Sequence, residues 1–135
     1  MTLKHINPPS LGSPRGYSNG ILVDNPGQLL FIAGQIGWDQ DQKLVSRDFV
    51  EQFDRALANV IEVVTAAGGT ANQIVRLVIY VTDIDEYRTR TREVGERYRS
   101  HMGKHFPAMV LIEVKSLLED AAQVEIEAVA ILSAE

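Results

Sequence analysis

The segment IVRLVIYVT, residues 74–82, is the feature that most limits how this chain can fold. Valine, isoleucine and tyrosine favour strands, and side chains alternate between the two faces of a strand. One face is entirely aliphatic: Val75, Leu77, Ile79 and Val81. The other face is apolar except for Arg76. A strand that is apolar on both faces is typical of the covered centre of a sheet. We expect a helix to pack on one face of this strand. A second subunit would be a natural partner for the other face.

Two amphipathic helices flank this strand. The first is predicted over Asp48–Ala67, with a capping-box pattern at Asp48 and Glu51 and a C-terminal stop at Gly68-Gly69. The second is predicted as one continuous helix over Ile84–His101, after another capping-box pattern. Apolar residues recur at three- and four-residue steps in both. Arginines on the outer side of the second helix alternate with glutamates, which favours a solvated, ion-paired face over an RNA-binding face.

Further segments with strand patterns lie on both sides of the helices. These are Lys4–Asn7, Asn19–Val23, Gln28–Gly34, Ala108–Val114 and Val124–Leu132. The turn residues Asp24–Gly27 predict a hairpin between the second and third of these segments. The last two segments are predicted to form another hairpin. The order of elements indicates an α+β sandwich, with one mixed sheet of about six strands packed against two helices, in a single domain over residues 1–135.

Two carboxylates interrupt the last strand. A side-chain period of two places Glu125 and Glu127 together, on the face opposite Ile126. Burial of a carboxylate costs several kcal/mol unless the group is paired or hydrogen-bonded. Two interpretations therefore stay open: a solvent-facing strand surface, where carboxylates usually lie, or an edge, interface or pocket that at least one of the two lines.

Composition excludes several classes of function. The net charge of −5 and the pI of about 5.2 argue against a nucleic-acid partner. The chain has no cysteine, hence no thiolate chemistry or disulfide framework. We find no signal-peptide pattern and no segment approaching the roughly 20 apolar residues of a membrane span. We therefore expect a cytoplasmic protein without a membrane partner.

Motifs for common chemistries are also missing. The sequence has no phosphate-binding glycine loop and no serine nucleophile elbow. His101 and His105 lack a third ligand at motif spacing, so no metal site is expected. What remains is a set of polar residues and one glycine beside apolar strands: Tyr17, Gly34, Gln35, Arg76, Glu113, Glu125 and Glu127. The residues alone thus indicate an α+β domain with a possible carboxylate-bearing pocket.

Several motifs resemble those of the Rid family of enamine/imine deaminases, also called RidA/YjgF or endoribonuclease L-PSP. In chain order they are Gly16-Tyr17-Ser18, LFIAGQI at 30–36, ALANVIEVVTAAGG at 56–69, IVRLVIYVTDIDEY at 74–87, HFPA at 105–108 and VEIEAVAIL at 124–132. The resemblance implies a chorismate-mutase-like α+β sandwich that assembles as a homotrimer, with ligand clefts between subunits. It implies hydrolysis of an imine or enamine to a 2-oxo acid and ammonia, without a metal or organic cofactor.

The resemblance also assigns the site. Glu125 would position or activate water, while Tyr17 and the segment Ala33, Gly34 and Gln35 would frame the ligand. Active members of the family carry an arginine directly after the Pro-Ala pair, where it clamps the substrate carboxylate. This chain has Met109 there, which offers neither charge nor donor.

Two functions follow from this departure. The first is a deaminase-like hydrolase with a retuned cleft, as in relatives that act on aminomuconate-type compounds. The second is a small-molecule binding or sensing protein that has lost imine deaminase activity. Arg15 and Arg76 are candidates to replace the missing arginine. The acidic pI and the lack of a histidine cluster argue against a ribonuclease.

Overall fold

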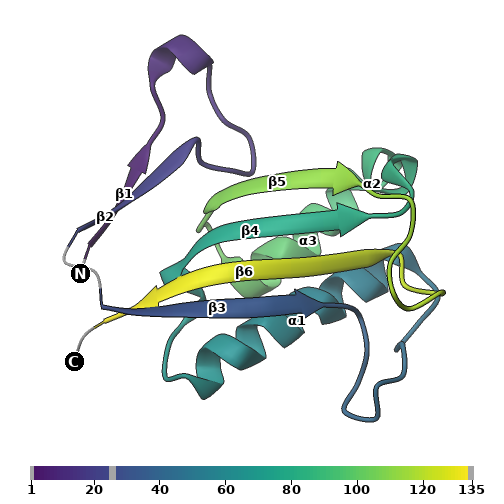
Figure 1. Ribbon diagram of the computed structural model, residues 1–135. Coiled ribbons are helices and arrows are strands. Elements are labelled where there is room, and N and C mark those ends of the chain that lie inside the picture. The colour runs from purple at the N-terminus through teal and green to yellow at the C-terminus, as the bar shows by residue number, and fades with distance from the viewer. Residues whose placement is uncertain (1, 25–26, 134–135) are drawn as a thin grey trace.

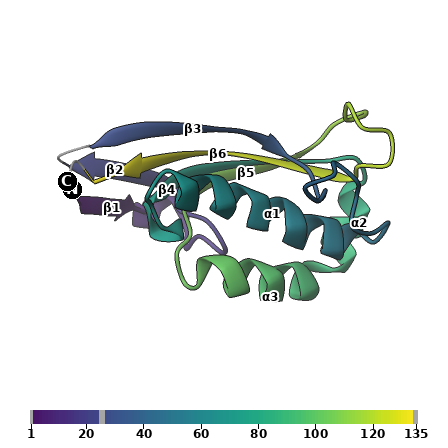
Figure 2. The same ribbon diagram turned by 90° about the horizontal axis from the view of Figure 1, so that it is seen from below.

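The computed structural model describes residues 2–24 and 27–133. In this part of the chain, a four-stranded mixed sheet has the order β3 (Gln28–Gln35), β6 (Val124–Leu132), β4 (Ile74–Val81) and β5 (Ala108–Glu113). Helices α1 (Phe49–Ala66) and α3 (Thr91–Met102) lie on one face of this sheet (Figures 1 and 2). The predicted α+β class is confirmed, and so is the inner position of the 74–82 strand.

The predicted hairpin of β2 (Gly20–Asp24) with β3 is wrong. The strand β2 pairs instead with β1 (Thr2–Ile6), and the two form a separate sheet in the described residues (Figure 1). Ser18 donates its backbone N–H to the Pro107 carbonyl at 3.1 Å, which fixes the start of β2 beside β5. In the described residues β2 has β1 as its partner, while β3 pairs with β6. The predicted six strands thus form two sheets rather than one. Asn25 and Pro26 of the predicted turn lie outside the described residues.

The predicted hairpin of the last two strands is also wrong. The strand β5 runs parallel to β4, with Met109 opposite Leu77. The strand β6 lies between β3 and β4 and is antiparallel to both. Parallel neighbours need a crossover connection, which α3 supplies here. One edge of β4 is paired with β5, so β6 pairs with the other edge. The connection 114–123 therefore crosses from β5 past β4 to reach it.

The start and the end of α1 agree with the prediction, but its capping box is only half formed. The Asp48 carboxylate accepts the backbone N–H of Glu51 at 3.1 Å. The backbone N–H of Asp48 donates to the Ser46 hydroxyl at 3.0 Å, rather than to Glu51. Gly68 has a φ of 90°, the positive value that favours glycine after a helix. The helix buries its predicted apolar stripe against the sheet: Phe49, Phe53, Leu57, Val60 and Val64 are buried.

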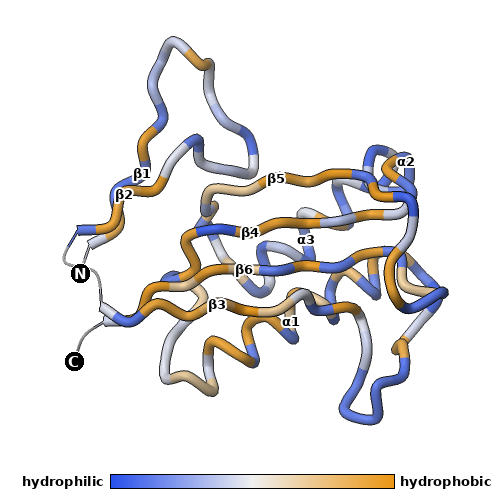
Figure 3. Tube along the Cα trace, in the orientation of Figure 1, coloured by the Kyte–Doolittle hydropathy of each residue, from blue (hydrophilic) through white to orange (hydrophobic). Residues whose placement is uncertain are grey.

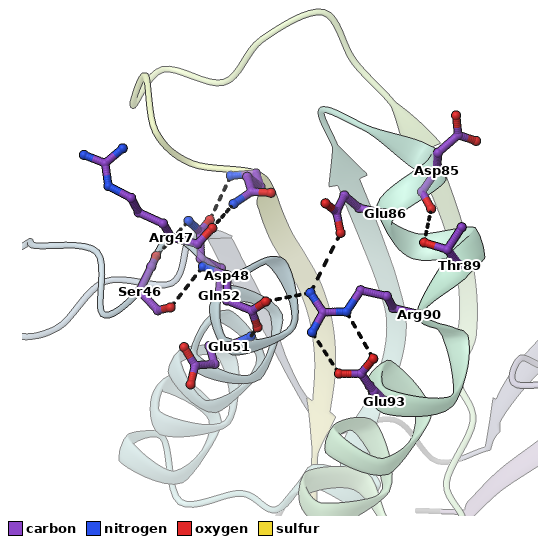
Figure 4. A network of polar contacts seen from close by, with 11 residues as sticks. Ser46, Arg47, Asp48, Glu51, Gln52, Asp85, Glu86, Thr89, Arg90 and Glu93 are labelled. Carbon is purple, nitrogen blue, oxygen red and sulfur yellow. Dashed lines mark hydrogen bonds and ion pairs between the residues drawn. The ribbon is translucent and has the colours of Figure 1, made fainter.

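The second predicted helix is broken at Arg90. It forms α2 (Ile84–Thr89) and α3, and between them Arg90 has φ −126° and ψ 28°. The Arg90 guanidinium donates to the Asp48 carboxylate at 2.6 Å and to the Glu93 carboxylate at 2.8 Å. Glu86 lies 3.8 Å away (Figure 4). Arg90 therefore joins the start of α1 to both pieces of the second helix at the point where the helix is broken.

This ion-pair cluster predicts a pH-dependent effect of the Arg90→Gln substitution. Hydrogen bonds from Arg90 lower the pKa of both the Asp48 and the Glu93 carboxyl groups. A lowered pKa contributes stability above the unfolded-state pKa of about 4, and that contribution is lost as the pH falls through the folded-state value. We expect Arg90→Gln to lower the melting temperature at about pH 7 and the difference from the parent protein to shrink as the pH falls below about 4.

The control for that measurement is Arg88→Gln. Arg88 is 66% exposed in its side chain and lies 3.5 Å from an exposed Asp85 carboxylate. Exposed pairs of this kind contribute little to stability. Equal melting temperatures for Arg90→Gln and Arg88→Gln at neutral pH would contradict the role given to Arg90.

The sheet face opposite the helices is uncovered in the described residues (Figure 2), and its strands are largely hydrophobic, with hydrophilic positions in β4 and β6 (Figure 3). Its exposed side chains come from both edge strands: Leu29 and Phe31 from β3, and Val110 and Ile112 from β5. Phe31 is 73% exposed. Exposed apolar side chains on one face of a sheet are typical of an interaction site. We name this surface the open face. Of the helices in the described residues, none combines the length and the apolar character needed to cross a bilayer.

Candidate functional site

Glu125 and Gly34 meet on the open face. Glu125 is half-buried on β6, opposite Tyr80 of β4. Gly34 is on β3, inside an irregularity of the β3–β6 pairing between Ile32 and Gln35. A Cβ atom at position 34 would lie 2.5 Å from Oε2 of Glu125. Only a glycine therefore leaves room for the carboxylate to lie against the backbone of β3. Two predicted site residues, far apart in the sequence, are adjacent in the structure.

The two carboxylates of β6 have different surroundings. Glu127 accepts a hydrogen bond from the Tyr80 hydroxyl, and this contact raises the pKa of Tyr80. Glu125 has no side-chain hydrogen-bond partner or ion pair among residues 2–24 and 27–133. The carboxylate of Glu127 is thus bound within the sheet, while that of Glu125 is available to a ligand or to water.

Ala33 and Gln35 lie beside Gly34 but differ in direction. Ala33 is exposed. The Gln35 side-chain amide donates to the Ala33 carbonyl at 3.1 Å, and Gln35 lines a groove with Arg55 and Asn59 of α1. Gln35 therefore points toward the helix layer, away from Glu125.

Met109 and Tyr17 lie elsewhere. Met109 of β5 lies opposite Leu77 of β4, and both side chains pack toward the helices and the core. Tyr17 is 38% exposed and precedes Ser18, which bridges to Ala108 at the start of β5. The predicted site residues therefore divide between the two faces of the sheet, with Glu125 and Gly34 on the open face and Met109 on the helix side.

The structure also places the candidate replacement cations. Arg76 is exposed on β4, opposite Val129, and so belongs to the open face. Arg15 is exposed in the loop before β2. Sequence reasoning missed Arg99 of α3, which lines one cavity together with Met109. In the sequence, Arg99 looks like the other arginines of its helix. The one feature near it that stands out is Gly95, one helical turn earlier.

The two histidines near the end of α3 have separate partners. Nε2 of His101 lies 2.7 Å from the Asp54 carboxylate, and Nε2 of His105 lies 2.7 Å from the Ile74 carbonyl. Burial lowers the pKa of His105. Across residues 2–24 and 27–133, no three histidine or carboxylate side chains are grouped closely enough to hold a metal ion.

Comparison with known sequences identifies the family. The model of the family described as Endoribonuclease L-PSP matches residues 9–132. A human protein named 2-iminobutanoate/2-iminopropanoate deaminase is 35% identical over 116 residues, which are 85% of this chain and 79% of the human protein. A RutC family protein of Aquifex aeolicus is 34% identical over 130 residues, 96% of this chain and 99% of that protein.

Solved structures give the same result. YyfB of Yersinia pestis, from the conserved Rid protein family, is 31% identical with a TM-score of 0.86, and the match covers 98% of this chain and 100% of YyfB. The E. coli protein TdcF with bound serine is 28% identical with a TM-score of 0.69, over 90% of this chain and 92% of TdcF. On the sequence match and the shared fold together, the chain belongs to the endoribonuclease L-PSP family, whose members include the Rid proteins.

Proposed function

We propose that this protein is a cytoplasmic, metal-free hydrolase of an enamine or imine carbon–nitrogen bond, in which Glu125 positions and activates water. The observation that carries the proposal is the Glu125 carboxylate, which lies against Gly34 without a side-chain partner in the described residues. A carboxylate in such a position is suited to general base catalysis, provided a substrate binds within reach. The name of the human relative, 2-iminobutanoate/2-iminopropanoate deaminase, supports this reaction class.

The chemistry requires one water and one proton-transferring group. Glu125 accepts a proton from water as the water oxygen adds to the imine carbon, and returns this proton to the nitrogen, which gives a carbinolamine. Glu125 then takes the proton of the carbinolamine hydroxyl and delivers it to the amine nitrogen, so that the carbon–nitrogen bond breaks and ammonia leaves as the carbonyl forms. One imine and one water give one 2-oxo compound and one ammonia, and Glu125 returns to its starting state.

The proposed cleft lies between subunits. Within one chain, Glu125 and Met109 are on opposite faces of the sheet, so they can line a common site only if they come from two copies. The exposed apolar side chains of the open face favour a second copy as its cover. With the family resemblance, this supports a homotrimer. Native light scattering is expected to give three times the 15.0 kDa chain mass, and a mass of 15.0 kDa would refute the assembly.

The direct test follows ammonia release from 2-iminobutanoate generated in situ and from 2-aminomuconate. We expect the parent protein to accelerate release from at least one of them, and Glu125→Gln to slow it by about 10²–10⁴-fold, the usual contribution of a general base. Glu127→Gln is the matched control, because glutamine can still accept the Tyr80 hydrogen bond. Equal losses in the two variants would contradict the role of Glu125.

A second candidate is a non-catalytic protein that binds or senses a small molecule. Met109 favours it, because a thioether cannot replace the bidentate bonds of an arginine to a carboxylate. A thermal-shift screen of metabolites decides between the two. A ligand that raises the melting temperature, with no acceleration of either test reaction, would identify the binding function.

A further inference from the structure

A groove of about 570 Å³ lies between the end of β3, the loop that follows it, and the middle of α1. Helix α1 runs alongside β3 in both views of the chain (Figures 1 and 2). The volume falls within the roughly 300–1,000 Å³ found for pockets that bury small molecules. Neither Glu125 nor Met109 belongs to the lining, so the groove is separate from the proposed cleft.

Asn59 fixes the polar wall of this groove. Its side-chain amide donates to the carbonyls of Ile36 and Trp38, both at 3.0 Å. Its side-chain carbonyl accepts a hydrogen bond from Nε of Arg55 at 3.1 Å. One residue of α1 therefore holds both the backbone of Trp38 and the guanidinium of Arg55. Groups that are already fixed in this way lose less conformational freedom when a ligand binds.

Arg55 brings a cation with free donors into the groove. A guanidinium carries several N–H donors, and in the described residues only the Nε–H of Arg55 is used, in the bond to Asn59. Arg55 is half-buried, and no carboxylate among residues 2–24 and 27–133 lies within ion-pair distance of it. The edge formed by its two Nη groups can therefore donate a pair of parallel hydrogen bonds to a carboxylate.

Glu62 brings the opposite charge. It is exposed, lines the groove and has no ion pair in the part of the chain that the structure describes. The other acid of the lining, Asp39, is already engaged, since its Oδ1 accepts the backbone N–H groups of Asp41 at 2.9 Å and Lys43 at 3.2 Å. The groove thus presents an open cation and an open carboxylate. A ligand with charge of one sign would be repelled by one of them.

The separation of these two charges selects the length of the ligand. Arg55 and Glu62 form no ion pair with each other, so their charged groups are more than 4.0 Å apart. Arg55 reaches along α1 to Asn59, and from Asn59 to Glu62 the helix rises by about 4.5 Å. In an α-amino acid the ammonium and the carboxylate are attached to the same carbon. In an ω-amino acid a methylene chain separates them, which fits charges that stand apart on the helix.

Trp38 supplies an apolar surface for such a chain. It lines the groove together with Ala58 and Val63 of α1. Its backbone N–H donates to the Ile36 carbonyl at 2.9 Å, and it pairs with Leu44 across the loop, so its backbone is held in place. Methylene groups gain free energy by packing on such a surface, and an ammonium group is attracted to an indole ring.

We infer that this groove binds an ω-amino carboxylate, with the carboxylate on Arg55, the ammonium at Glu62 and the methylene chain against Trp38. Each charged end of the ligand then meets a group of opposite charge. The inference does not depend on the proposed hydrolase, because the groove and the proposed catalytic carboxylate share no residue.

The test uses Trp38, the only tryptophan of the chain, whose fluorescence reports on this groove. The full chain is titrated with 5-aminopentanoate and with matched compounds, and calorimetry checks the affinities. Pentanoate lacks the ammonium, pentylamine lacks the carboxylate, and norvaline is an isomer with both groups on the same carbon. We expect 5-aminopentanoate to bind at least about tenfold more tightly than each of them, a difference of about 1.4 kcal/mol. Absence of binding, or equal affinity for any of the matched compounds, would overturn the inference.

Substitutions separate the two ends of the site. Arg55→Gln is expected to remove the preference for 5-aminopentanoate over pentylamine, and Glu62→Gln to remove the preference over pentanoate. The matched controls lie outside the lining: Arg92→Gln, at a side chain that is 92% exposed, and Glu51→Gln, at an exposed position of α1. An unchanged preference in either variant, or an equal loss in its control, would overturn the inference. Melting temperatures confirm that each variant is folded.

The outcome is separable from that of the proposed function. Glu125→Gln is expected to leave the affinity for 5-aminopentanoate unchanged, because Glu125 does not line the groove. If binding were lost in Glu125→Gln and kept in Arg55→Gln, the ligand would lie in the proposed cleft and this inference would fail. If binding requires Arg55 while neither test reaction is accelerated, this inference stands and the hydrolase proposal fails.

Discussion

The Gly34→Ala variant is expected to lose about two orders of magnitude in kcat/KM for imine hydrolysis while it keeps its fold. A methyl group at position 34 would lie 2.5 Å from Oε2, 2.7 Å from Cδ and 2.9 Å from Cγ of Glu125. The whole end of the glutamate must therefore move, and a displacement of about 1 Å in a catalytic group can cost about a hundredfold in rate. Ammonia release under single-substrate conditions measures the effect.

The matched control for this variant is Gly20→Ala. Gly20 is also in a strand, and an added Cβ would meet Ile6 at an ordinary 3.6 Å. Neither glycine has a positive φ, so neither substitution strains the backbone. If Gly34→Ala were as active as Gly20→Ala, the contact with Glu125 would have no part in the reaction.

The Gln52→Leu variant is expected to lose at least about 2 kcal/mol of unfolding free energy, because each buried polar group left without a partner costs about 1–3 kcal/mol. Gln52 is fully buried in α1. Its amide donates to the carbonyls of Ser46 at 3.0 Å and Ala121 at 3.1 Å, and its carbonyl accepts the backbone N–H of Gln123 at 2.8 Å. Leucine has a similar size and can replace none of these bonds. Urea denaturation measures the loss.

The control is Gln40→Leu, at an exposed loop position where the same exchange breaks no such bonds. A loss below about 1 kcal/mol in Gln52→Leu would show that water satisfies the freed backbone groups. Because Gln123 precedes the strand that carries Glu125, we also expect lower activity in this variant.

The elements of the fold follow from local patterns, but their pairing does not. Helix α1 begins after Asp48 and ends before Gly68, as caps and periodicity predict, because both signals act within a few residues. The break at Arg90 was not predicted, and Arg90 there contacts Asp48, which is distant in the chain. The two mistaken hairpins have the same origin. Turn residues bend the chain, whereas the partner of each strand is decided by contacts such as that of Ser18 with Pro107.

The candidate site shows the same division. A period of two correctly places Glu125 and Glu127 on one face, since alternation is a property of the strand itself. It does not distinguish them, because the difference lies in Tyr80 on a neighbouring strand. The sequence did not point to Arg99, because its position beside Met109 depends on the packing of α3 near β5. No local spacing in the sequence encodes that packing.

The inner position of β6 has a consequence for how the chain acquires this structure. Its neighbours β3 and β4 are both synthesised earlier, and Gln28 of β3 pairs with Leu132 at the far end of β6. Until residues 124–132 emerge, each neighbour exposes a strand edge that later lies inside the sheet. Pairing across such long sequence separations is slow, and unpaired edges promote aggregation. The strand β6, which carries the proposed catalytic carboxylate of Glu125, is thus also the strand whose pairing ends the most aggregation-prone stage of folding.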